Sequence, residues 1–99
     1  MKIKLRYNVE KGGDNMNIDE TLSERQKTHG DFENHAEIST ALKSICHTSR
    51  NWNDLPPVYK EGLDMIMHKV ARIVSGNPLH RDHVIDIQGY AKLMEKYCE

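Results

Sequence analysis

The chain has 99 residues, which is enough for one small domain. It carries 14 Lys and Arg against 15 Asp and Glu, and this balance argues against nucleic-acid binding driven by bulk charge. With a mean hydropathy of −0.74, the chain contains no run of about 18 apolar residues that could cross a membrane. The two cysteines, Cys46 and Cys98, lack the spacing of a disulfide scaffold or a zinc finger. We therefore expect a cytoplasmic protein with reduced thiols and no membrane or nucleic-acid partner.

Residues 1–16 differ from the rest, because they hold four basic and only two acidic side chains. Alternating apolar residues at 3, 5, 7 and 9 could form one strand, but the sequence offers that strand no partner. The segment 12–15 contains two glycines and interrupts any regular element. Met16 follows at once. We predict that residues 1–16 are an N-terminal extension, disordered or not translated natively, and that a helical domain spans residues 17–99.

Two helices are predicted in the first half of this domain. Asn17 or Asp19 can cap a helix that runs to about Thr28, and Gly30 stops it. Asp31 can cap a second helix over about residues 32–50. A loop follows at residues 51–57.

Two further helices are predicted after this loop. Asp54 and the two prolines start the third helix, which ends in the segment 75–78. Its apolar positions recur at helical spacing: Leu63, Ile66, Met67, Val70, Ile73 and Val74. The fourth begins near residues 81–82 and runs through Val84, Ile87, Ala91, Met94 and Cys98. The predicted fold class is all-α, a small four-helix bundle.

Several polar residues fall on the apolar faces of these helices when each is projected at about 100° per residue. In the first helix, Arg25 and His29 continue the thin stripe of Ile18 and Leu22. Either this helix is half docked, or both side chains point into a shared interior. In the second helix, His35 lies on the face formed by Ile38, Leu42, Ile45 and Cys46. Glu33 and Glu37 lie on the opposite face, as a solvated pair or as a metal-binding pair.

The last two helices add more inward polar groups. Lys69 lies beside the core, whereas Glu61, Asp64, His68 and Arg72 form an opposite stripe that suits surface ion pairs. In the fourth helix His83 falls on the apolar face and Asp86 at its edge, with Tyr90 as a candidate partner. Asp86 is therefore either structural or part of a ligand or metal site. Gly89 suggests the close approach of another helix or a ligand.

These side chains form a cation-rich set that suits an anionic ligand, and phosphate is the commonest such anion. The predicted ligand-binding residues are Arg25, His29, His35, Lys69, Arg72, His83, Asp86 and Tyr90. If the protein binds a metal ion, Asp82 and Asp86 are the candidate ligands.

Three stretches resemble a small helical phage and prophage domain of unknown function. They are residues 25–32 (RQKTHGDF), 67–73 (MHKVARI) and 82–91 (DHVIDIQGYA). That domain is similar in turn to the all-α nucleoside triphosphate pyrophosphohydrolases of the MazG type. The resemblance implies a MazG-like homo-oligomer in a bacterial host cell, with the ligand cleft between helices of two subunits. In the hydrolases, carboxylates hold Mg²⁺ against the triphosphate, and water attack releases a monophosphate and pyrophosphate.

The sequence favours binding without cleavage. It lacks the paired inward carboxylates of the hydrolases, since Glu33 and Glu37 have a different spacing and His83 stands three residues before Asp86. We predict a protein that binds or sequesters a nucleotide or nucleotide-derived signal, which makes it a candidate against host defence and requires no cofactor for binding. One alternative is a Mg²⁺-dependent pyrophosphohydrolase. A second is a protein-interaction module that uses Met65, Ile85 and Trp52.

Overall fold

The computed structural model describes residues 17–99 as four α-helices and one 3₁₀ turn, with no strand in that range. The elements are α2 (Ile18–His29), α3 (Phe32–His47), η1 (Trp52–Asp54), α4 (Pro57–Ser75) and α5 (Arg81–Glu95). The predicted all-helical fold is therefore confirmed. The expected N-terminal extension and the start at Met16 lie outside the described residues.

Local capping explains where α2 and α3 begin. The Asn17 side chain accepts a hydrogen bond from the Glu20 backbone at 2.8 Å, and the Glu20 carboxylate accepts one from the Asn17 backbone at 2.9 Å. This reciprocal pair satisfies two of the free N–H groups at the start of a helix. Asp31 caps α3 by accepting from the backbone of Asn34. Both caps were predicted. Because α2 ends at His29 and Asp31 caps α3, Gly30 forms the α2–α3 corner.

Two helices end earlier than predicted. The chain leaves α3 at His47 rather than near Arg50, because it turns into η1. Similarly, α5 ends at Glu95, so Cys98 lies beyond the helix, where its sulfur is 2.9 Å from the Tyr59 hydroxyl. The C-terminal residues thus fold back toward the start of α4.

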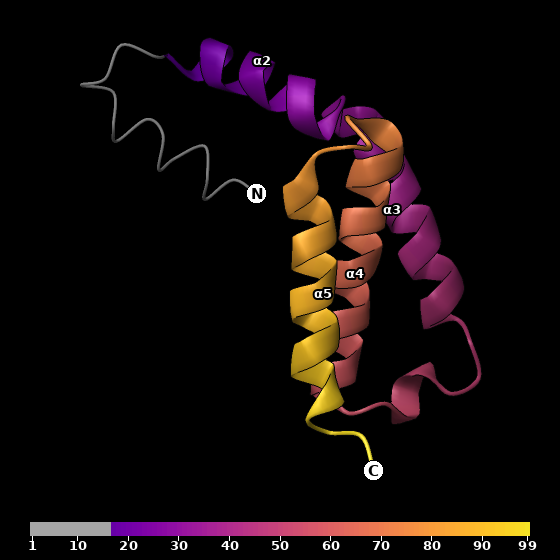
Figure 1. Ribbon diagram of the computed structural model, residues 1–99. Coiled ribbons are helices and arrows are strands. Elements are labelled where there is room, and N and C mark those ends of the chain that lie inside the picture. Colours follow the sequence, from indigo (N-terminus) through magenta and orange to yellow (C-terminus); the bar gives the residue numbers. More distant parts are fainter. Residues whose placement is uncertain (1–16) are drawn as a thin grey trace.

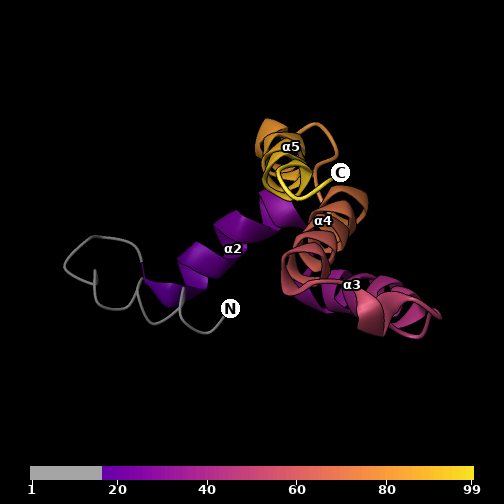
Figure 2. The same cartoon turned by 90° about the horizontal axis from the view of Figure 1, so that it is seen from below.

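The three longer helices form a row with α4 in the middle (Figures 1 and 2). Helix α4 packs against α3 on one side and α5 on the other, and these are the two largest helix contacts. Helix α2 projects away from one end of the row and makes smaller contacts with α3 and α4. Each outer helix of the row therefore has a large face that no long helix covers.

This open arrangement leaves a thin core. Among the described residues, Trp52 and Ala71 are the buried apolar side chains, whereas His35, Ser39 and His83 are the buried polar ones. Trp52 belongs to this core, with its ring against His47.

Some predicted core residues are exposed instead. Ile45 and Val74 are 71% and 62% exposed, and Leu22 and Val84 are also largely in solvent. The apolar stripe of each helix is wider than the contacts that its neighbours make, so part of each stripe faces outward.

The α2–α3 corner and the α4–α5 corner meet through their backbones. The backbone N–H of Asn77 donates to the carbonyl of Thr28 at 3.1 Å. The Ser75 hydroxyl lies 3.3 Å from the carbonyl of His29, while its shorter hydrogen bond, at 2.6 Å, goes to the carbonyl of Ala71 in its own helix. A Cβ atom on Gly30 would collide with the Ser75 carbonyl, and one on Gly76 would lie 2.5 Å from the His29 carbonyl carbon. Glycine is thus required on both sides of this crossing, and Gly30 also has a φ of +82°.

We expect Gly30→Ala to destabilise the fold by about 2–4 kcal/mol, since it adds backbone strain to a steric clash. Urea unfolding followed by circular dichroism measures this loss. Ser44→Ala, at an exposed position in α3, is the control and should change stability by less than about 0.5 kcal/mol. Equal stability of the Gly30 variant and the wild type would contradict the tight crossing.

Candidate functional site

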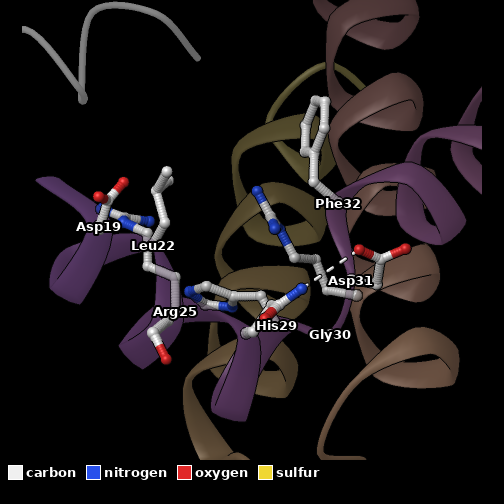
Figure 3. Close-up of a pocket in the computed structure, with 10 residues that line it drawn as sticks. Asp19, Leu22, Arg25, His29, Gly30, Asp31 and Phe32 are labelled. Carbon is white, nitrogen blue, oxygen red and sulfur yellow. Dashed lines mark hydrogen bonds between the residues drawn. The ribbon is translucent and has the colours of Figure 1, made fainter.

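A pocket of about 520 Å³ lies between α2, the α2–α3 corner and α4 (Figure 3). Its lining residues are Asp19, Leu22, Ser23, Arg25, Gln26, His29, Gly30, Asp31, Phe32 and Arg72. The volume falls in the range of small-molecule sites. Because the lining comes from three elements, the pocket exists only when the two corners are docked.

Two arginines from different helices line this pocket, Arg25 on α2 and Arg72 on α4. Neither guanidinium forms an ion pair with a carboxylate of residues 17–99. Burial, followed by the charge of Arg25, lowers the pKa of Arg72, which places the two cations within electrostatic reach of each other. Two like charges held together without a carboxylate partner form a favourable place for an anion.

The rest of the lining combines apolar and acidic groups. Leu22 and Phe32 are 44% and 52% exposed and stand on opposite sides of the pocket (Figure 3). Asp31 is already engaged, because it caps α3 and accepts a hydrogen bond from the Gln26 side-chain amide at 3.2 Å. Asp19 is exposed in the first turn of α2. The pocket can therefore accept hydrogen bonds at its edge and contact an apolar surface.

His29 joins the pocket to a cluster of three imidazoles. Its Nδ1 lies 3.4 Å from Nε2 of His83, and the His80 ring lies 6.0 Å from the His29 ring and 4.9 Å from that of His83. Burial lowers the pKa of His29 to about 4, with a further contribution from the charge of Arg72. Burial also lowers the pKa of His83, which is 1% exposed. His29 and His83 therefore take up a proton less readily than a free imidazole does.

A second pair of imidazoles lies between α3 and α4. His35 and His68 meet edge to face with ring centroids 4.5 Å apart. Burial lowers the pKa of His35 to about 4 and that of His68 to about 3. Nδ1 of His35 and Nδ1 of His83 are buried and have no hydrogen-bond partner in the described structure. Such unpaired groups are costly, so both imidazoles depend on remaining uncharged.

Lys69 and Asp86 form an ion pair between α4 and α5, with Nζ 2.9 Å from Oδ2. The hydrogen bond from Lys69 lowers the pKa of the Asp86 carboxyl. In the described structure the partner of Asp86 is therefore Lys69 rather than Tyr90, the predicted candidate. This ion pair joins two helices and lies outside the pocket lining.

The candidate metal ligands do not converge. The Asp82 carboxylate is 74% exposed and lies 3.5 Å from His80, whereas Asp86 is held by Lys69. Glu33 and Glu37 are exposed on α3. Within residues 17–99, no group of three or more His, Cys, Asp or Glu side chains is placed to hold a metal ion.

The structure thus divides the predicted ligand-binding set. Arg25, His29 and Arg72 line one pocket, and His83 contacts it through His29. His35 belongs to the pair with His68, and the remaining residues of the set, Lys69, Asp86 and Tyr90, lie along α4 and α5 outside the lining.

Sequence reasoning missed three contributors. Phe32 was predicted only as the first residue of a helix, and His80 was assigned to no helix. His68 was predicted to lie on the polar stripe of the third helix. Helix α4 packs against α3 as well as α5, and His68 lies on the side that faces α3, where it contacts His35. Its position one helical turn before Arg72 was the available signal, since residues at i and i+4 share a face.

The buried histidines predict a loss of stability in acid. Their folded-state pKa values lie below the ordinary 6.5, so the unfolded chain binds more protons below that pH. Stability is complete above pH 6.5 and falls as the pH drops toward about 4, by up to about 1.4 kcal/mol per pH unit for each proton taken up. Urea unfolding over this range measures the slope, and His68→Gln should reduce it. An unchanged slope in that variant would exclude His68 as a source.

Comparisons with known proteins place the chain in a family. No curated protein and no solved structure matches the chain. No helix in the described range has both the length and the apolar character of a membrane span. Residues 17–98 match a family model described as "Domain of unknown function (DUF6378)". Because the match covers most of the chain, the chain belongs to the DUF6378 family.

Proposed function

We propose that the pocket binds a nucleotide or nucleotide-derived molecule, with a phosphate group between Arg25 and Arg72. The carrying observation is that these two guanidinium groups line one pocket and form no ion pair with a described carboxylate. The planar fork of arginine matches phosphate oxygens through paired hydrogen bonds. A bound phosphate would also offset the repulsion between the two cations.

The other lining residues favour a nucleotide over a simple anion. Phe32 and Leu22 provide apolar surface on which a planar base can lie. Asp19 and Asp31 offer acceptors for hydroxyl or amino groups, which a ribose or a base carries and inorganic phosphate lacks. Neutral His29 can donate one further hydrogen bond.

The lining residues support nucleotide binding without cleavage better than they support nucleotide hydrolysis. Hydrolysis of the MazG type needs several carboxylates around Mg²⁺, and the predicted metal ligand Asp86 is paired with Lys69 outside the pocket lining. The arginine pair, by contrast, can hold phosphate without a metal ion. The MazG likeness, the phage setting and the capture of a host signal belong to this proposal, in which the protein acts by sequestration.

Removing either arginine should abolish most of the binding. We expect Arg25→Ala and Arg72→Ala each to weaken nucleotide affinity by about tenfold or more, because a charge-assisted contact to phosphate is lost. Arg72→Lys should recover part of the loss, since it keeps the charge without the fork. Calorimetry with a panel of mono-, di- and cyclic nucleotides measures these effects.

Lys27→Ala is the matched control for charge. Lys27 lies on α2, is exposed, pairs with Glu24 and is not part of the lining. It should leave affinity within about twofold. Chromatography of nucleotides incubated with the protein, before and after heating, separates the outcomes: intact nucleotide released by heat supports sequestration, and cleaved nucleotide refutes it. Wild-type affinity in both arginine variants would remove the proposed site.

Phe32 should distinguish a nucleotide from its phosphate alone. We expect Phe32→Ala to weaken nucleotide binding by about five- to tenfold through loss of stacking, but to leave inorganic pyrophosphate binding unchanged. Phe32→Tyr keeps the ring and serves as the control. Competition assays with both ligands measure the contrast, and an equal loss for both would place the base elsewhere.

A further inference from the structure

The outer face of α5 carries apolar side chains that nothing in the described chain covers. Ile85 and Leu93 are 45% and 53% exposed, and Tyr97, in the turn that follows, is 60% exposed. Helix α5 is the end member of the row (Figure 2), and it contacts α4 on another side, where Asp86 pairs with Lys69.

Gly89 lies between Ile85 and Leu93 on this face, because the three are spaced four residues apart. A Cβ atom on Gly89 would meet nothing within 4 Å. The described fold therefore has no use for glycine here, although glycine disfavours a helix relative to alanine. Gly62 on α4 is different, since a Cβ there would meet the side chain of Met94. Any close approach to Gly89 would therefore have to come from outside residues 17–99.

The face is self-complementary about Gly89. In an antiparallel pair of α5 helices with the two-fold axis at Gly89, Ile85 lies opposite Leu93 of the second copy, and Asp82 lies opposite its Lys96. Asp82 is 74% exposed in its side chain, and Lys96 is exposed and keeps a helical backbone. The apolar positions thus meet apolar ones, and each acid meets a base.

A parallel pair would have the opposite effect. It would bring Asp82 against Asp82 and Lys96 against Lys96, and like charges across an interface are costly. The charge order along α5 therefore specifies the direction as well as the face. We propose that the chain forms a two-fold dimer through an antiparallel α5–α5 contact centred on Gly89. This proposal is independent of the ligand pocket.

Charge exchange tests the pairing. Sedimentation of the full chain should show a dimer for the wild type at about 100 µM. Asp82→Lys and Lys96→Asp should each weaken the dimer by about tenfold or more, because each places like charges opposite one another twice. An equimolar mixture of the two variants should dimerise again, and so should the double variant, since both arrangements restore opposite charges. Helical content by circular dichroism confirms that every variant is folded.

A monomeric wild type, single variants that dimerise normally, or a mixture that stays monomeric would each overturn the proposal. Gly89→Leu gives a second readout that does not depend on charge. It should leave the helical content intact, because the position is open within the chain, and it should abolish the dimer by blocking close approach. If this face of α5 is instead exposed to solvent, Gly89→Leu should leave the molecular mass measured by sedimentation unchanged.

Discussion

The contact between the two glycine corners is the constraint on which the site depends. Gly30 and Gly76 allow the α2–α3 backbone to touch the α4–α5 backbone, and a hydrogen bond from the Asn77 backbone to Thr28 holds the two together. Helix α2 has no buried residue of its own, so its position relies on this crossing. The crossing is also what brings Arg25 of α2 near Arg72 of α4, and His29 near His83. Backbone fit at one point thereby creates the pocket.

The interior is built from neutral imidazoles where most small domains use aliphatic side chains. His35 and His83 are nearly inaccessible, and each leaves one ring nitrogen unpaired. Their surroundings contain Arg72 and Lys69, so protonation would add charge to a cation-rich region. Such a core contributes less to stability than an apolar one of equal volume. It does give the helices specific partners, because imidazole edges and faces fit only in particular arrangements.

Helical periodicity and capping predicted most of the fold. The structure has the helix starts that were predicted from Asn17, Asp31 and the paired prolines. The first helix also ends at Gly30, as predicted. The open row was beyond such reasoning, because periodicity shows which stripe is apolar but not how much of it a neighbour covers. Ile45 and Val74 were therefore expected in the core but are exposed.

For the site, projection placed Arg25, His29 and His83 on apolar stripes; in the structure Arg25 and His29 line one pocket, and His83 lies beside His29. It could not show that Lys69 and Asp86 satisfy one another, because that contact depends on the spacing between two helices. It also could not find Phe32 as a pocket wall, since the wall exists only after α2 docks.

The positive charges of Arg25 and Arg72 would attract the proposed ligand, and they also disfavour protonation of His29. The pKa of His29 is low because of burial first and the charges of Arg72, His83 and Arg25 after it. An anion between the arginines would cancel part of that positive field and raise the pKa of His29 toward its ordinary value. Ligand binding and proton uptake would then favour one another, since each makes the other less costly. On this proposal, an anion held between the arginines would bind more tightly as the surroundings become acidic.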